Sequence, residues 1–236
     1  MFRRRSAGAH RRQAGQELEE TSPIPGSGPW DAGESYPERP RVDLGSLLIP
    51  VEPGMEVQLN VAEEHIVAAS VTHGRSSLQV QALAAPKSGS LWDDLREEVA
   101  TEVGQLGGQT HETEGPFGTE VRASMPAEPG EGPLEPARFF GVDGPRWLLR
   151  GVIRGEAAAD DDLARPLEDV FAGIVVVRGD HPAPPRDLLE IRLPEELRQA
   201  MEQEMAEQEM AEQETTPERS RYPSPFERGP EITETR

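Results

Sequence analysis

The stretch Arg138–Gly155, RFFGVDGPRWLLRGVIRG, determines how we interpret the fold. From position 146 onward two kinds of side chain alternate along it. One set is Trp147, Leu149, Gly151 and Ile153, and the other is Arg146, Leu148, Arg150, Val152 and Arg154. Successive side chains of a strand point to opposite faces of the sheet. We therefore predict a strand with Trp147 on a buried core side and arginines on the other side.

Around this strand lies a candidate binding face. Its residues are Arg122, Arg138, Phe140, Arg146, Arg150 and Arg154. Two interpretations stay open at this stage. The arginines could bind an anionic partner, with Phe140 as an exposed stacking surface. Alternatively they could pair with Glu112, Glu114 or Glu120 on neighbouring strands, with Phe140 in the core.

The rest of the sheet is predicted from shorter patterns. We expect strands over residues 46–51, 55–60, 66–72, 78–84, 118–124, 138–142, 146–153 and 174–178. A helix follows Ser90, which can cap it, and ends at Gly107-Gly108. A second helix is expected over residues 163–171, with Pro166 near its first turn. Together these elements predict an α+β fold, a mainly antiparallel sheet with two helices packed on one face.

Charge divides the chain into three parts. Residues 1–40 contain six basic and six acidic side chains among many glycines and prolines, and we expect a disordered arm. Residues 41–193 contain nearly all the apolar periodicity, enough for a single folded domain. Residues 194–236 contain twelve acidic and five basic side chains and the repeat QEMAEQEMAEQE, so we expect an acidic tail that is partly helical or disordered.

Composition limits the class of protein. The 236 residues have a formal net charge of −20 and no cysteine, which excludes disulfides and thiolate ligands. The basic start MFRRRSAGAHRR is followed by no apolar segment of the kind that a signal peptide needs. The longest apolar run, Phe171–Val177, is far too short to cross a bilayer. We therefore expect a soluble, cytoplasmic protein.

No catalytic, cofactor or metal site is predicted. The five histidines are scattered, without the helical or hairpin spacing of a metal site. The chain has no GxSxG or Walker A pattern and no dinucleotide-binding fingerprint after a strand. The acidic run at residues 160–162 is typical of the first turn of a helix, where carboxylates complement the helix dipole.

Five segments, in order, resemble a known family. They are VDLGSLLIP, APKSGSLWDDLREEV, EGPFGTEVRA, GVDGPRWLLRGVIRG and VVVRGDHPAPPRDLL. The chain is similar over about residues 42–193 to uncharacterised actinobacterial proteins that share a domain of unknown function. The resemblance implies a cytoplasmic actinobacterial protein and assigns no catalytic or binding residue.

Three classes of function are compatible with these observations. The first is a non-catalytic binding or adaptor domain whose arginine face takes an acidic protein segment or another anion. The second is association with nucleic acid through this face and the basic N-terminal arm, although a net charge of −20 opposes it. The third is an enzyme with a site that the sequence does not identify. The sequence favours the first class and predicts no membrane association.

Overall fold

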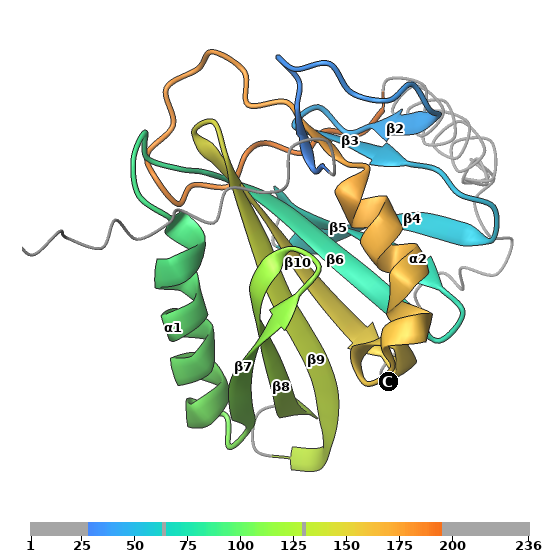
Figure 1. The fold of residues 1–236 in the computed structure, drawn as a ribbon, viewed down its shortest axis with the longest axis vertical. Helices are drawn as coiled ribbons and strands as arrows, with labels where there is room; N and C mark the ends of the chain where they lie inside the picture. Colours follow the sequence, from blue (N-terminus) through green and yellow to red (C-terminus); the bar gives the residue numbers. More distant parts are fainter. Residues whose placement is uncertain (1–27, 63–64, 129–130, 195–236) are drawn as a thin grey trace, which may run out of the picture. The chain divides into compact units, whose positions relative to one another are not determined.

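The computed structural model describes residues 28–62, 65–128 and 131–194 (Figure 1). In chain order the elements are β1 (Trp30–Asp31), β2 (Arg41–Asp43), β3 (Leu47–Pro50), β4 (Met55–Ala62), β5 (His65–His73), β6 (Ser76–Ala84), α1 (Leu91–Gln105), β7 (Gln109–Gly115), β8 (Gly118–Glu128), β9 (Glu131–Gly144), β10 (Trp147–Gly155), a 3₁₀ turn (Glu156–Ala158), α2 (Asp161–Ala172) and β11 (Val175–Val176). Every strand pairing is antiparallel except that of β1 with β11. The predicted α+β class is confirmed. Within the described residues, no helix is long and apolar enough to cross a membrane.

The larger sheet has seven strands in the order β4-β5-β6-β10-β9-β8-β7. β10 lies near its middle, and Arg150 on β10 faces Gln81 of β6 and Gly141 of β9. The glycines and proline of Gly141–Pro145 predict a turn there, but the hairpin between β9 and β10 turns later, at Pro145 and Arg146. Arg146 therefore lies in the turn and not on the strand, with a left-handed φ of 64° that non-glycine residues rarely adopt.

The smaller sheet, in the order β1-β11-β3-β2, shares one core with α2 and the larger sheet. Fully buried side chains from all three parts meet there, among them Ile49 of β3, Val176 of β11, Phe171 of α2 and Leu149 of β10. The apolar side of the larger sheet is thus covered by a helix and a second sheet. Burial of apolar surface between these layers is the main favourable contribution to folding.

Ser90 caps α1 as the sequence predicts. Its hydroxyl accepts a hydrogen bond from the Asp93 amide at 3.1 Å. The carboxylate of Asp143, at the end of β9, accepts from the Leu91 amide at 3.0 Å and from the Ser90 hydroxyl at 2.8 Å. Asp93 pairs with Arg96 one turn later instead of completing a capping box. The distant Asp143 therefore fastens the start of α1 to the sheet.

α2 begins two residues earlier than predicted. Asp160 is its cap, and the carboxylate accepts from the amides of Asp162 at 2.9 Å and Leu163 at 3.2 Å. The acidic run thus has the dipole-complementing position expected for it. Pro166 consequently lies in the second turn instead of the first, where its missing amide proton removes one helix hydrogen bond.

The two helices lie on opposite faces of the larger sheet, which differs from the expectation of a shared face. A side chain at Gly141 of β9 would collide with Trp92 of α1, and one at Gly151 of β10 would approach Phe171 of α2. Phe171 also packs edge-on against Phe140 at 4.8 Å between ring centres. Because Phe140 and Gly141 are successive residues of one strand, they point to opposite faces. The sheet is covered on both sides because its arginine-bearing face also carries apolar residues that require burial.

Trp147 is buried, as predicted, with only 1% of its surface exposed. Its indole N–H donates a hydrogen bond to the Asp31 carboxylate at 2.6 Å. Asp31 belongs to β1, which pairs with β11 (Trp30 opposite Val175) and thereby joins the smaller sheet. An acceptor for the one polar atom of this side chain thus comes from a segment more than a hundred residues earlier in the chain.

Ordered structure begins before the predicted boundary at Arg41. β1 lies within the segment 1–40 that the sequence suggested was a disordered arm, and its isolated pair Trp30-Asp31 carries no periodic pattern. β7 was also missed, because QTHETEG has no apolar alternation. The acidic, proline- and glycine-rich composition of residues 127–136 is typical of a linker, but residues 127–128 belong to β8 and residues 131–136 to β9. The predicted acidic tail lies beyond the described residues, apart from Pro194.

Candidate binding face on the sheet

Arg146, Arg150 and Arg154 differ from the other arginines of the described residues. Their side chains make no hydrogen bond or ion pair within that part of the chain. Each of the others has at least one such partner, either a carboxylate or a backbone carbonyl. Arg150 and Arg154 are four residues apart on β10, about 13 Å for an extended chain, and Arg146 lies in the turn before the strand.

Arg150 is the most constrained of the three. It is half-buried, and its Nε atom is fully buried without a hydrogen-bond partner among the described residues. The guanidinium lies 5.7 Å from the centre of the Phe139 ring, within the range of a cation–π contact. Burial lowers the pKa of Arg150; the charge of Glu102 opposes this shift and that of Arg154 adds to it. Leaving a buried donor unpaired is unfavourable, and Arg39, Arg96 and Arg138 each have one such nitrogen as well. Arg150 differs from these three because its other nitrogens have no partner among the described residues either.

The surface beside Arg150 is polar. On β6, Gln79 and Gln81 alternate with buried apolar residues, and Gln81 donates to the Val67 carbonyl at 3.0 Å. On β5 and β4, the Ser70 hydroxyl donates to the Asn60 side chain at 2.7 Å. Gln81 is the direct neighbour of Arg150 in the register, and Gln79 lies two residues away on the same strand face. Ser70 lies opposite Gln79 and therefore shares this face. We call this surface, from Arg150 and Arg154 across Gln79 and Gln81, the β10–β6 face.

Arg154 and Arg146 lie at the two ends of β10. Arg154 is exposed and has the same parity as Arg150, so it belongs to the β10–β6 face. Arg146 is exposed in the β9–β10 turn, where its backbone carbonyl accepts hydrogen bonds from the Ala85 amide at 3.0 Å and from Arg178 Nε at 3.3 Å. The pair Arg150 and Arg154 is therefore assigned to one face, and Arg146 borders the end of the strand.

Arg138 and Arg122 lie on the opposite face, towards α2. Arg138 is only 1% exposed, and its Nε and NH2 atoms donate to the two oxygens of Glu120 at 3.1 and 2.9 Å. Glu120 is equally buried and also accepts from the Nε of Arg122 at 2.9 Å. Arg122 and Arg138 stand directly opposite each other on β8 and β9, and Glu120 neutralises both. These two arginines therefore pair with a glutamate of the sheet, as the second of the two interpretations of the sequence predicts.

α2 completes this ion cluster with one carboxylate at its first residue and one in its second half. Glu168 accepts from Arg138 at 2.7 Å, and Asp161 accepts from Arg122 at 2.7 Å. Burial alone would lower the pKa of Arg138, but its bonds with Glu120 and Glu168 outweigh burial and raise it. The hydrogen bond from Arg122 lowers the pKa of Asp161. Both arginines are thus occupied in holding α2 against β8 and β9.

Phe140 is a core residue and not an exposed stacking surface. It is 1% exposed and lies within 5.3 Å, ring centre to ring centre, of Phe117 and Phe171. Phe117 and Phe171 also contact each other at 4.7 Å. The three rings form one aromatic cluster between the sheet and α2, and aromatic pairs of this kind stabilise a core beyond their buried area.

The structure therefore divides the six candidate residues. Arg150 and Arg154 remain on one accessible face, Arg146 borders it, and Arg122, Arg138 and Phe140 belong to the opposite interior. Sequence reasoning missed Gln79 and Gln81 as neighbours of Arg150. The alternation of residues 78–84 could have placed them on a polar side of the strand, but only the register with β10 brings them beside Arg150.

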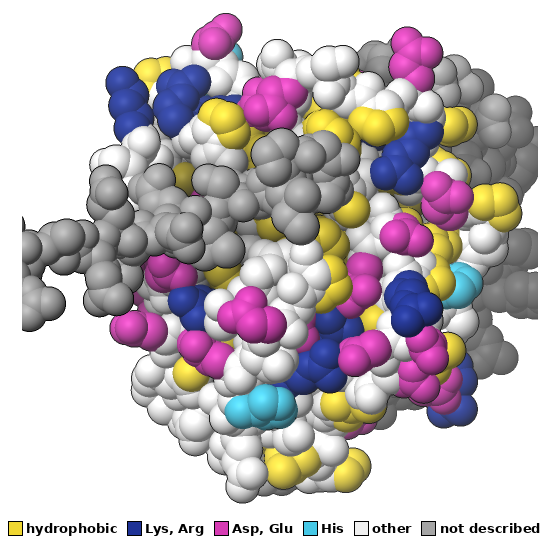
Figure 2. Space-filling model, in the orientation of Figure 1, with side chains coloured by type: hydrophobic (Ala, Val, Ile, Leu, Met, Phe, Trp, Pro, Cys, Tyr) yellow, Lys and Arg dark blue, Asp and Glu magenta, His cyan; other side chains and the backbone are white. Residues whose placement is uncertain are grey.

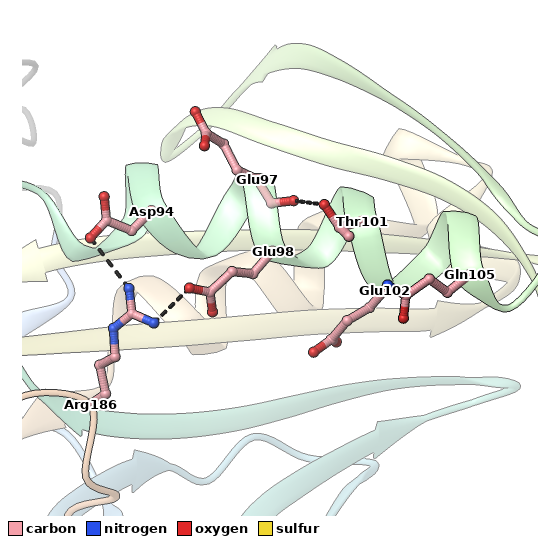
Figure 3. Close-up of a pocket in the computed structure, with 7 residues that line it drawn as sticks. All are labelled: Asp94, Glu97, Glu98, Thr101, Glu102, Gln105 and Arg186. Atoms are coloured by element: carbon pink, nitrogen blue, oxygen red, sulfur yellow. Dashed lines mark hydrogen bonds and ion pairs between the residues drawn. The ribbon is translucent and has the colours of Figure 1, made fainter.

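α1 forms an acidic border next to this face. Figure 3 shows a shallow groove along the helix, lined by Asp94, Glu97, Glu98, Thr101, Glu102, Gln105 and Arg186. Arg186 reaches from the proline-rich exit segment and donates to Glu98 at 2.6 Å and Asp94 at 3.4 Å. Glu102 has no such cation, and its charge acts on Arg150. Glu102 therefore disfavours an anion on the α1 side of Arg150.

The side of the molecule that carries α2 has mixed charge. Figure 2 shows basic and acidic side chains interspersed there, as in the exposed pair of Arg165 with Asp162 at 3.0 Å. Among the described residues there is no group of three or more histidine, aspartate or glutamate side chains that could hold a metal ion.

A family model for a protein of unknown function, DUF3710, matches residues 28–200. The chain belongs to this family. The match begins at Gly28, two residues before β1, so the family's domain includes the segment that supplies Asp31 to Trp147. No curated protein and no solved structure matches the chain. The family's description assigns no activity.

Proposed function

We propose that this domain is a non-catalytic binding or adaptor module that takes an acidic protein segment on the β10–β6 face. The observation that supports the proposal is the contrast among the arginines. Arg150 and Arg154, like Arg146 in the turn before them, have no side-chain partner in the described residues, whereas the other arginines of that part are paired. A half-buried guanidinium gains most from a carboxylate, because charge-assisted bonds to Arg are short and often bidentate.

The neighbouring side chains support an extended acidic ligand. Gln79 provides an amide donor on the same face, one strand away from Arg150. Arg154 lies about 13 Å further along β10, the distance covered by about four residues of an extended peptide. Glu102 of α1 repels carboxylates on its own side, which directs such a ligand over β6. We therefore propose a segment with acidic side chains about four residues apart.

Nucleic-acid association is the second candidate, because phosphates would also satisfy the same arginines. Its further element, the basic arm with Arg3-Arg4-Arg5 and Arg11-Arg12, lies outside the described residues. The net charge of −20 opposes it. An enzyme remains the third class, for which we identify no residues. A cytoplasmic location and an actinobacterial origin are retained as parts of the proposal.

The test is a titration of the full-length protein with a fluorescent oligoglutamate peptide and, separately, a labelled single-stranded oligothymidylate. Fluorescence anisotropy is measured at low and high salt for the wild type, Arg150→Gln and Arg165→Gln. Arg165 is an exposed arginine on α2, so its variant has the same change of charge away from the β10–β6 face.

We expect the peptide to bind at low salt and to be weakened by Arg150→Gln but not by Arg165→Gln. Binding should decline at high salt, because exposed charges are screened. Absence of peptide binding, or an equal loss in both variants, refutes the proposal. Tighter binding of the oligothymidylate with a steeper salt dependence establishes the nucleic-acid alternative instead.

A further inference from the structure

The two edges of the seven-stranded sheet differ in chemistry. The edges are β4 and β7, each with one side unpaired among the described residues. β7 reads QTHETEG, contains no large apolar side chain, and is held to α1 by the ion pair of Glu112 with Arg96 at 2.9 Å. β4 reads MEVQLNVA and has Glu56 as its one charged residue. Natural sheets usually protect an edge with charge, proline or a covering element.

β4 carries an apolar stripe along one of its faces. Met55, Val57, Leu59 and Val61 alternate with polar residues and therefore point to the same side. The first three are partly buried against the core, whereas Val61 is 64% exposed. The irregularity in the β4–β5 register skips Val67, a β5 residue, so the alternation of β4 itself continues through Val61. The stripe thus extends beyond the core almost to the last residue of the strand, Ala62.

We propose that β4 pairs with β4 of a second copy of this chain, antiparallel about a two-fold axis at Gln58. This register places Val57 opposite Leu59 and Met55 opposite Val61, so the two apolar stripes join. It also places Glu56 opposite Asn60, so that no like charges face each other. Gln58 faces its own counterpart. A two-fold interface must be self-complementary in this way, and the sequence of β4 satisfies that condition over all of residues 55–61.

The pairing supplies partners for the free backbone amides and carbonyls of the edge, as in other cases of strand addition. One strand edge buries much less than a standard interface, so the dimer is weak and depends on concentration. The net charge of −20 on each copy opposes association, so added salt should strengthen this dimer. That salt dependence is opposite to the one expected for an acidic ligand on Arg150, and the two proposals can fail independently.

The experiment is analytical ultracentrifugation of the full-length protein from about 1 μM to about 1 mM, at low and high salt. Gln58→Lys places two positive charges face to face across the two-fold axis, and Gln58 is exposed in the single chain. Gln109→Lys is the matched control, because Gln109 is an exposed glutamine on the other edge strand, β7. The two variants change the net charge equally. Circular dichroism verifies that both are folded.

We expect a monomer–dimer equilibrium in the wild type and in Gln109→Lys, and association at least about fivefold weaker in Gln58→Lys. An equimolar mixture of Gln58→Lys with Gln58→Glu should restore association, since opposite charges then face each other. A wild type that stays monomeric at all concentrations overturns the proposal. Equal weakening by both lysine variants, or a mixture that does not recover, also overturns it.

Discussion

Replacing Glu120 by glutamine tests the buried ion cluster beneath α2. Glu120 accepts three hydrogen bonds, two from Arg138 and one from Arg122, and it is 1% exposed. Glutamine has nearly the same shape but no charge, so the packing is kept while the neutralising charge is lost. The two arginines, directly opposite each other on β8 and β9, then repel across the ladder.

The expected loss of unfolding free energy depends on which carboxylates still pair with Arg138 and Arg122 in the variant. Removing one member of a buried ion pair costs about 3–5 kcal/mol, because its partner's charge stays buried. Glu168 still accepts from Arg138 and Asp161 still accepts from Arg122, so we expect the lower end, about 3 kcal/mol. For a domain of this length each kcal/mol moves Tm by about 2–4 °C, which predicts a fall of about 6–12 °C.

Thermal and urea unfolding followed by circular dichroism would measure this loss. A double variant, Glu120→Met with Arg138→Met, should cost less than Glu120→Gln alone, because a pair removed as a whole leaves neither charge unmatched. Glu190→Gln, which removes an exposed partner of Arg192, should leave Tm unchanged. The reasoning is refuted if Glu120→Gln costs less than about 1 kcal/mol, or if the double variant is the more destabilised.

Three further predictions concern single positions, each measured by urea unfolding. Asp31→Ala should cost about 1–3 kcal/mol because the Trp147 indole N–H stays buried without its acceptor, and Asp31→Asn should recover part of this; no loss would refute the contact. Trp147→Ala should cost about 3–5 kcal/mol and Arg150→Ala less than about 1 kcal/mol; the reverse order would mean that the faces of β10 are exchanged. Since Arg122 lowers the pKa of Asp161, the carboxylate stabilises the fold above about pH 4, its ordinary range, and this contribution disappears as pH falls through the lowered value. Asp161→Asn should therefore flatten the acid side of the stability profile, and an unchanged slope would refute the assignment.

Local patterns predicted much of the fold. The alternation after Arg146 located β10 and the burial of Trp147, because a strand between two layers needs apolar side chains at fixed parity. Ser90 identified the start of α1, since a cap requires only a hydroxyl and the next turn of the helix. Features of this kind depend on residues a few positions apart, so one sequence is enough to predict them.

Non-local features could not be predicted in the same way. Arginine is usually exposed, so the sequence does not indicate that Arg138 is buried. Only the fold places Glu120 and Glu168 around it. The parity that relates Arg138 to Arg150 depends on the β9–β10 register, which is fixed where the hairpin turns at Pro145-Arg146. The sequence suggested an earlier turn, and the six candidates therefore appeared to share one face. A change of register by one residue exchanges the faces of a strand. A predicted turn that is misplaced by one residue therefore assigns half of the candidate residues to the wrong face of the sheet.

Arg150 lies where stability and the proposed function conflict. The positions on either side of it with the same parity, Leu148 and Val152, are buried, and an apolar residue at 150 would fit between them without an unpaired donor. β10 pairs along its length with β6 and β9, so the backbone cannot move Arg150 away from this environment. Functional sites often retain residues that lower stability. Arg150→Met, which has an unbranched side chain and no donor, should accordingly be at least as stable as the wild type in urea while losing affinity for the acidic peptide. A variant that loses stability and keeps affinity would make Arg150 a structural residue and leave the β10–β6 face without its main contact.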